Sequence, residues 1–375
     1  MKCFCKIIFV LLISLLLLKS CSEEYKGSAT TGDSFVRDLQ ATLTELNVTS
    51  GSYPNLSDDM VPVQILAAPD TDLLVVADYT GQSLRLLDKN GDELSSTGGL
   101  GRGPGEFQGI NQLYISYNQL LYVVDIQLRR LTVFEIQVEQ LAYQTTISLN
   151  YASNMHLQRI YVTETGTFGV FNKLDDYQTW ENRFHLYRLD ESFHPEEHIL
   201  EMPGNEKIEI ISRLFIDNPL GSLTFWDIDG EWFYYIRSNS NEIHKFHLTT
   251  GDREIVQYLN FEERVNTSHN IAFLKENMQG LIERYPVVGE AIEKSQTLPL
   301  FRDLLVQDDQ MLLSIYHAGG DYGAILHIDQ ESEEVSYIKT PPYFRHLSLR
   351  NHIVYGIDST PPDERRIMYV KLNYD

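Results

Sequence analysis

The sequence contains little cysteine, with three residues in 375, at positions 3, 5 and 21. The first two lie in an N-terminal segment that has the form of a secretory signal, so a mature chain would keep Cys21 alone. An exported chain with one cysteine can form no internal disulfide. The fold must then be stabilised by a buried core, for which about 355 residues provide enough chain.

The N-terminal apolar run, residues 7–18, is too short to cross a membrane, because a spanning helix needs roughly 20 apolar residues. Lys2 and Lys6 lie before this run, and the small residue Ser20 follows it. A positive start, an apolar centre and a small residue before the cleavage point are typical of a targeting signal. We therefore predict that residues 1–20 are a signal peptide.

Leu18-Lys19-Ser20-Cys21 resembles a bacterial lipobox, although Lys19 departs from the usual second position. The resemblance implies cleavage before Cys21, a diacylglycerol on its thiol and attachment to a membrane through that lipid. An ordinary signal-peptidase site beside an incidental cysteine is the alternative. Ser22-Glu23-Glu24 is similar to the acidic signal that sends some Bacteroidetes lipoproteins to the cell surface. We expect an outer-membrane lipoprotein of the bacterial cell envelope, periplasmic or surface-exposed, with a flexible tether over residues 21–34.

Positive charge is scarce, since 30 Lys and Arg against 53 Asp and Glu give a formal net charge of −23. Loss of Lys2, Lys6 and Lys19 with the signal removes three positive charges and leaves −26. Such an excess of carboxylates repels phosphate backbones and anionic lipid surfaces, so no nucleic-acid partner is expected. A solubilising surface explains this acidity more simply than a dedicated cation site.

The sequence repeats itself at a period typical of β-propellers. DLLVVADYTGQSLRLLD at residues 72–88 recurs as QLLYVVDIQLRRLTVFE at residues 119–135, a shift of 47 residues. In each copy two runs rich in β-branched and apolar residues flank an Asp-led turn, which predicts an antiparallel hairpin. Weaker copies with the same plan follow at residues 157–190, 223–248, 303–329 and 346–372. Together they predict an all-β fold, a six-bladed β-propeller over residues 35–375.

Residues 257–299 interrupt the β pattern. Apolar residues at helical spacing follow the capping candidates Thr267 and Ser268, and Pro286 ends this helix. A second short helix follows the proline. We predict that the whole segment is a helical insertion between blades four and five.

A propeller needs its first and last segments to interlock, because an open ring leaves a long unpaired strand edge. The last blade has only three expected strands, at about residues 347–349, 352–357 and 366–372. The run Leu39–Leu43 alternates apolar and polar residues. We predict that this run supplies the fourth strand.

A glycine-rich segment joins the first two repeats. Gly98-Gly-Leu-Gly-Arg-Gly-Pro-Gly-Glu-Phe107, followed by Asn111-Gln-Leu113 and LYVVD at residues 121–125, resembles the six-bladed β-propeller lipoproteins of Bacteroidetes and their relatives. These are similar to NHL-repeat propellers. The resemblance implies the fold and an envelope location but no reaction. In such a loop Phe107 would pack between neighbouring blades.

No common catalytic signature occurs in the sequence, because a G-x-S-x-G elbow, an H-E-x-x-H helix and a C-x-x-C pair are all absent. Asp227-Ile-Asp229-Gly230 begins like a calcium loop but lacks the further carboxylates of an EF-hand, so we predict a hairpin turn. Arg102, Glu106 and Asn111 are the candidate ligand contacts, because they flank the entry to an inner strand at one mouth of the ring. Loop-stabilising hydrogen bonds are the alternative for these three residues.

A lipid tether, propeller repeats and no catalytic signature favour a binding protein that holds a ligand or an envelope protein at one face. The 22 tyrosines and three tryptophans could provide contact surfaces for a carbohydrate or a peptide ligand, although packing between blades explains most of these residues. The alternatives are a metal-dependent lactonase or lyase with a divalent cation in the central channel, and a purely structural scaffold. We expect a monomer.

Overall fold

The structure is a computed structural model that describes residues 35–373 except 36–38, 40, 54–59, 70, 174–181, 213 and 360–364. The predicted signal peptide, Cys21 and the predicted tether lie outside the described residues. Of the helices that are described, none is long and apolar enough to span a membrane.

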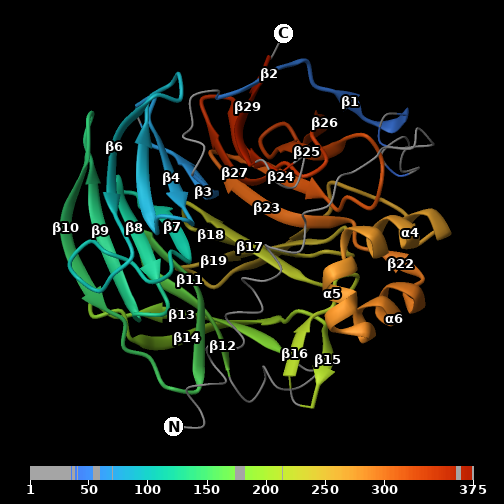
Figure 1. Ribbon diagram of the computed structural model, residues 1–375, viewed down its shortest axis with the longest axis horizontal. Coiled ribbons are helices and arrows are strands. Elements are labelled where there is room, and N and C mark those ends of the chain that lie inside the picture. The colour runs from blue at the N-terminus through green and yellow to red at the C-terminus, as the bar shows by residue number, and fades with distance from the viewer. Residues whose placement is uncertain are drawn as a thin grey trace.

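Six antiparallel sheets surround one axis and form the six blades that the sequence predicts (Figure 1). The first strand of each is innermost, because these strands contact one another between neighbouring blades. Blades one to three consist of β3 (Pro62–Ala67), β4 (Leu74–Asp78), β5 (Ser83–Leu87) and β6 (Glu93–Gly98); β7 (Gln112–Ile115), β8 (Leu120–Asp125), β9 (Arg130–Ile136) and β10 (Leu141–Ser148); and β11 (Met155–Thr163), β12 (Gly166–Lys173), β13 (Arg183–Leu189) and β14 (Pro195–Pro203). Blades four to six consist of β17 (Thr224–Asp229), β18 (Trp232–Arg237), β19 (Ile243–His247) and β20 (Arg253–Val256); β23 (Phe301–Gln307), β24 (Gln310–Ile315), β25 (Gly323–Asp329) and β26 (Glu334–Thr340); and β27 (Arg345–Arg350), β28 (Ile353–Asp358), β29 (Arg366–Leu372) and β2 (Val48–Ser52).

Each blade lies between two others, so its middle strands are covered on both faces and contain few polar residues. All five residues of β4 are buried. Valine and leucine suit such strands, because branched side chains pack well on a pleated surface. Phe107 is fully buried in an apolar cluster that the first two blades share, as the sequence predicts.

Two glutamines tie the inner strands of the first three blades together. The Gln64 side-chain amide donates to the Asn111 carbonyl (2.9 Å), and its oxygen accepts from the Leu113 N–H (2.6 Å). At the equivalent place in the next blade, the Gln112 amide donates to the Ile160 carbonyl and its oxygen accepts from the Ile160 N–H, both at 2.8 Å. Each glutamine therefore satisfies backbone groups of the following blade.

Three further junctions are bridged in a similar way by a side chain of one inner strand and the backbone of a neighbouring blade. The pairs are Asp227 with the Val306 N–H (2.9 Å), Arg302 with the Phe344 carbonyl (2.7 Å) and Ser348 with the Ala67 N–H (2.9 Å). These bonds hold the inner strands in register around the axis.

The N-terminal segment closes the ring, but with other residues than the sequence predicts. β2 (Val48–Ser52) pairs antiparallel with β29 as the fourth strand of the last blade, and β1 (Thr44–Glu45) pairs parallel with β26 (Figure 1). The predicted strand Leu39–Leu43 is wrong, because the Leu43 N–H donates to the Leu39 carbonyl in a helical turn (2.8 Å). Leucines four residues apart fit one helix face as well as they fit a strand.

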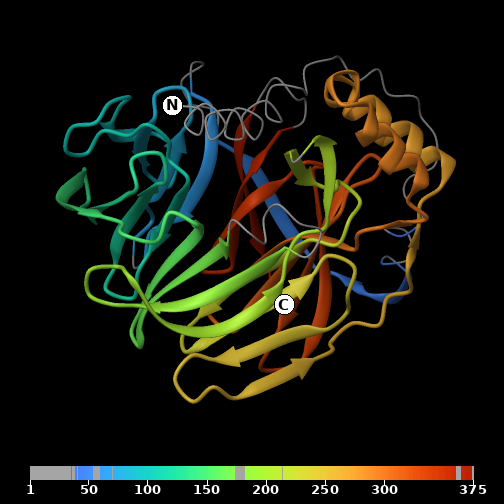
Figure 2. The same ribbon diagram turned by 90° about the horizontal axis from the view of Figure 1, so that it is seen from below.

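Two insertions lie on one face of the propeller (Figure 2). The predicted helical insertion contains β21 (Arg264–Val265), α4 (Ser268–Asn277), α5 (Gln279–Arg284), α6 (Pro286–Lys294) and β22 (Thr297–Leu298), with Thr267 as the N-cap of α4. A hairpin between blades three and four, β15 (Lys207–Ile211) and β16 (Leu214–Asp217), was not predicted. Ile208 of the hairpin packs with Val288 and Ile292 of α6. We call residues 207–217 and 264–298 together the cap, and its face the upper face.

Proline substitution in β2 tests the closure. The Tyr53 N–H donates to the Ile367 carbonyl, and the Asn47 carbonyl accepts from the Asn373 N–H. The backbone N–H of every second residue of β2, including Thr49, therefore points toward β29. Thr49→Pro removes one donor to β29, and we expect it to lower the free energy of unfolding by about 1–3 kcal/mol.

Ser50→Pro is the matched control, because the N–H of Ser50 points away from β29. Urea denaturation of both variants provides the measurement. Equal free energies of unfolding for the two variants would show that β2 does not close the ring.

Candidate functional site

Two of the predicted ligand contacts, Arg102 and Glu106, lie in the loop between β6 and β7. The Glu106 carboxylate accepts from the Gly103 N–H (2.7 Å). Arg130 donates to the Arg102 carbonyl (3.0 Å) and also to the Glu106 carbonyl. The Arg102 and Glu106 side chains are exposed. This loop is therefore braced from within.

The third predicted contact, Asn111, is half-buried, and its side-chain oxygen accepts from the Ile126 N–H (2.8 Å). Its carbonyl is the acceptor of Gln64 described above. The structure thus shows loop-stabilising hydrogen bonds for Glu106 and Asn111. Ligand contact by the three residues stays a prediction.

A cluster of charged side chains lies where the inner strands meet. Arg159 of β11 interacts electrostatically with Asp227 of β17 and with Asp303 of β23. Arg302 of β23 interacts with Arg345, the first residue of β27. Together with His346, these residues form what we call the axial cluster, which draws on four of the six blades.

Solvent reaches the axial cluster although protein surrounds it. Arg159, Arg302, Asp303 and Arg345 are half-buried, and His346 is exposed. Arg302 and Arg345 lie near the starts of their strands, and β23 directly follows the cap. These two arginines therefore lie at the upper end of the axis, on the side of the cap.

Irregular pairing accompanies three members of the cluster. The register shifts between Leu157 and Arg159, between Phe301 and Asp303, and between Arg345 and Ser348, a stretch that includes His346. A β-bulge adds a residue to one strand and turns a side chain away from the regular alternation. The bulges allow charged side chains to reach the axis from strands that otherwise face apolar neighbours.

Burial raises the pKa of Asp227 to about 6, against the opposing effect of Arg159 and of hydrogen bonds from the Val306 and Ile228 N–H groups. The Asp227 side chain is 8% exposed. Burial likewise raises the pKa of Asp303, again opposed by Arg159. The arginine does not fully compensate for the loss of water around either carboxyl group.

Positive charge dominates at the upper end of the axis. Burial and then Arg345 lower the pKa of Arg302 to about 10. His346 is exposed, but the protein around the axis still removes water from its ring, and this desolvation lowers its pKa to about 3 together with Arg345, Arg365, Arg302 and Arg159. Loss of water alone lowers the pKa of a basic group, and the neighbouring arginines lower both values further.

Two tyrosines lie beside the cluster. The Tyr114 and Tyr161 rings meet edge to face at a centroid distance of 5.3 Å, and Arg159 donates to the Tyr161 hydroxyl (3.4 Å). Burial raises the pKa of both hydroxyls, so they stay protonated. Tyr161 is fully buried in the apolar cluster that blades three and four share, so of the two rings only the half-buried Tyr114 is partly open to solvent.

His317 lies between the cap and the axis. Its ring contacts Phe273 of α4 (5.2 Å) and Tyr343 (5.3 Å), and it is 9% exposed. Burial, followed by Arg302 and Arg264, lowers its pKa to about 3. Within the described part of the chain, Nε2 of His317 and Nε of Arg302 are buried without a hydrogen-bond partner. Two nitrogen atoms close to the axial cluster are therefore unsatisfied.

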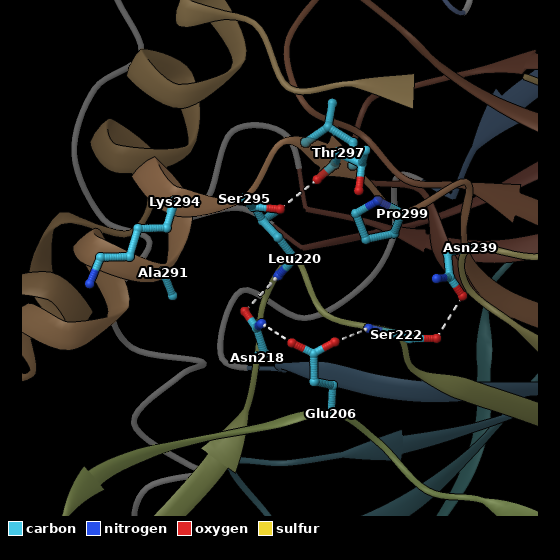
Figure 3. A pocket seen from close by; sticks show the side chains of 11 residues that line it. Glu206, Asn218, Leu220, Ser222, Asn239, Ala291, Lys294, Ser295, Thr297 and Pro299 are labelled. Carbon is cyan, nitrogen blue, oxygen red and sulfur yellow. Dashed lines mark hydrogen bonds between the residues drawn. The ribbon is translucent and has the colours of Figure 1, made fainter. Parts of the chain in front are cut away.

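A pocket of about 320 Å³ lies between the cap and blade four (Figure 3). Glu206 accepts from the Asn218 amide (2.7 Å) and from the Ser222 N–H (3.2 Å), and the Ser222 hydroxyl donates to Asn239 (2.6 Å). Lys294 points away from Glu206 in Figure 3 and donates to Glu290 (2.9 Å). Because these polar groups bond to one another, we interpret the pocket as the joint between cap and propeller.

A second, more open pocket of about 640 Å³ lies between blades two and three. The Arg129 guanidinium lies 4.1 Å from the Tyr151 ring centroid on its wall, and His194 is at its edge. Arg129 also donates to the Tyr151 carbonyl, so its charge is already engaged.

The described residues contain no group of three or more His, Cys, Asp or Glu side chains that could hold a metal ion. At the axis the carboxyl groups of Asp227 and Asp303 stand beside arginines, which repel a cation. The predicted channel cation stays a prediction that these residues do not favour.

Sequence patterns reveal little of this site. The predicted hairpin turn at Asp227–Gly230 is confirmed, because Asp229 pairs with Trp232 across Gly230, whose φ is +55°. The charge of Asp227 itself was not recognised as part of the axis. The available signal was a charged residue inside the otherwise apolar first strand of a repeat, as in β17, β23 and β27.

A family described as a 6-bladed β-propeller, DUF5128, matches residues 60–365 of the chain. No curated protein matches the chain in sequence. The family match confirms the resemblance to six-bladed propellers that residues 98–125 indicate.

Two solved structures share the fold at low identity. A Bacteroides fragilis protein whose name assigns it to export aligns with a TM-score of 0.55 and 11% identity over 88% of this chain and 96% of its own. A DUF4221 member from Bacteroides vulgatus aligns with a TM-score of 0.52 and 9% identity over 88% of this chain and 100% of its own. A gluconolactonase from Xanthomonas campestris reaches a TM-score of only 0.44, with 12% identity over 92% of this chain and 93% of its own.

Asp227 predicts a specific dependence of stability on pH. Its pKa rises from an ordinary 3.8 to about 6 on folding, so the folded state holds its proton more tightly than the unfolded state. Its contribution to stability is full below about pH 4, falls as the pH rises through 6, and stays low above. We expect the free energy of unfolding of Asp227→Asn, relative to wild type, to rise by about 2 kcal/mol between pH 4 and pH 7.

Denaturation curves at the two pH values measure this difference. Asp321→Asn, at an exposed position, controls for the loss of one negative charge. The assignment is wrong if the Asp227→Asn and wild-type curves stay equally far apart at both pH values.

Proposed function

The chain belongs to the DUF5128 family of six-bladed β-propellers, and we propose that it is an envelope binding protein whose ligand enters at the upper end of the axis. The observation that carries the proposal is the axial cluster. Charged side chains with little access to water reduce stability unless they are paired or used. Groups with strongly shifted pKa values that converge from several strands are typical of functional sites.

The upper end of the axis is accessible to a ligand. His346 is exposed there, and the half-buried Tyr114, whose ring packs on the buried Tyr161, lies deeper along the axis. Guanidinium groups beside aromatic rings suit a ligand that combines polar and apolar parts, such as a sugar or a short peptide.

We place the protein in the cell envelope, tethered through a lipid on Cys21. Support comes from the signal and lipobox patterns of the sequence and from the name of the Bacteroides fragilis neighbour. Phe35, the first described residue, packs against Phe261 (5.3 Å) and below the Arg264 guanidinium (4.6 Å). The chain therefore joins the propeller beside the cap, and a tether over residues 21–34 would extend at most about 50 Å from there.

A lactonase- or lyase-type enzyme is the second candidate. A carboxyl group with a pKa of about 6, such as that of Asp227, can transfer protons near neutral pH. Turnover of lactones by the purified protein, abolished in Asp227→Asn, would favour the enzyme over the binding protein.

Lipidation is tested in a bacterial host that expresses the full chain. We expect labelled palmitate to be incorporated by the wild type and lost in Cys21→Ser, because the lipobox resemblance assigns the acyl chains to that cysteine. Cys5→Ser, inside the signal, is the matched control and should keep the label. Equal labelling of all three proteins would contradict the assignment.

Blocking the upper end of the axis tests the binding site without assuming a ligand charge. His346 and His352 are both exposed, both have positive φ (55° and 61°) and lie at opposite ends of blade six. A thermal-shift screen of oligosaccharides and short peptides identifies ligands of the wild type. We expect His346→Trp to reduce the affinity for these ligands at least about 10-fold, while His352→Trp binds them as the wild type does.

The binding site is elsewhere if both tryptophan variants bind these ligands as the wild type does. A screen with no ligand at all would contradict the binding function itself.

A further inference from the structure

An acidic protein gathers positive charge at one end of its axis. The chain carries a net charge of −23, yet four arginines act on the single side chain of His346. They come from three blades: Arg159 from blade three, Arg302 from blade five, and Arg345 and Arg365 from blade six. Arg365 also donates to the Pro62 carbonyl (3.2 Å), which fixes it beside the inner strand of blade one.

The carboxylates of the cluster do not neutralise this end of the axis. Asp227 and Asp303 interact first with Arg159. Arg302 is affected more by Arg345 than by the adjacent Asp303. At Arg302 the effect of the like-charged Arg345 thus exceeds that of Asp303, so the potential at this guanidinium is positive.

Unsatisfied donors occur at the same end. Among the described atoms, Arg302 uses Nη2 to donate to the Phe344 carbonyl (2.7 Å), while its buried Nε has no partner. His317, which interacts electrostatically with Arg302, also has a buried Nε2 without a partner. A buried donor without an acceptor reduces stability, so an acceptor at this place would stabilise the protein.

We propose that the upper end of the axis binds a compact oxyanion group, a carboxylate, phosphate or sulfate, with Arg302 and His317 as donors and with Arg345 adding positive charge beside Arg302. The inference rests on the proposed function and names the chemistry of its ligand. A planar guanidinium presents donors that match two oxygens of such a group, and a neutral imidazole adds one N–H. An uncharged sugar or peptide amide would leave the positive potential uncompensated.

The probes are sodium sulfate, sodium phosphate and sodium acetate, each added to the mature wild-type protein at constant ionic strength set with sodium chloride. We expect a saturable rise of the melting temperature with at least one oxyanion and none with chloride. The anion that saturates at the lowest concentration identifies which of the three groups the ligand carries.

Arg302→Gln removes the charge and is expected to reduce the affinity for that anion about 10- to 100-fold, the effect of one charge-assisted hydrogen bond. Arg302→Lys keeps the charge and should reduce the affinity less. Arg253→Gln, at an exposed position on β20, is the matched control and should bind as the wild type does.

A second measurement uses the wild type alone and needs no variant to fold. An anion between Arg302 and His317 shields the imidazole from the arginines, so the pKa of His317, observed by NMR titration, should rise when the anion is saturating. Saturable binding with this rise supports the site.

The proposal is overturned if an oxyanion still raises the melting temperature of Arg302→Gln and leaves the pKa of His317 in the wild type unchanged. If no oxyanion binds while a neutral ligand from the screen is blocked by His346→Trp, the anion inference fails and the binding function stands. If nothing binds at the axis in either experiment, both fail.

Discussion

The packing of each blade between two others is the interaction on which the rest of the structure depends. A propeller blade has two apolar faces, and only a closed ring covers both faces of all six. β2 completes the last blade against β29, while Gln64 and Gln112 bond the inner strands of the first blades to one another. With the inner strands fixed around the axis, side chains from distant parts of the chain are held close together, which is what a preorganised binding site requires.

The parts of the fold that could be predicted are those that follow from local sequence patterns. Strand alternation repeated at 47 residues indicates the blades, the helical spacing after Thr267 indicates the insertion, and Phe107 ends a recognisable loop. The closing strand could not be located, because Leu39 and Leu43 fit a helical turn and a strand equally well. The hairpin at residues 207–217 was missed because its apolar residues, which pack on α6, resemble an ordinary continuation of blade three.

The site depends on features that no local pattern encodes. Arg159, Asp227 and Arg302 come from three different blades, so their proximity follows from the ring and not from their spacing in the sequence. Bulges beside Arg159 and Arg302 break the strict alternation from which the facing of a strand residue is usually inferred. The glycine-rich sequence around Arg102 and Glu106 made this loop a predicted ligand contact, yet the polar groups of the loop mainly form hydrogen bonds that stabilise the loop. A charged residue in the first strand of a propeller repeat is the more informative signal.

The most direct test of the account is a crystal structure of the mature protein with selenate, an oxyanion whose position is given by the anomalous scattering of selenium. The account predicts an anomalous peak at the upper end of the axis, with selenate oxygens within hydrogen-bond distance of Arg302 Nε and His317 Nε2. Selenate found only on the outer surface, with both nitrogen atoms bonded to protein groups at the axis, would contradict it.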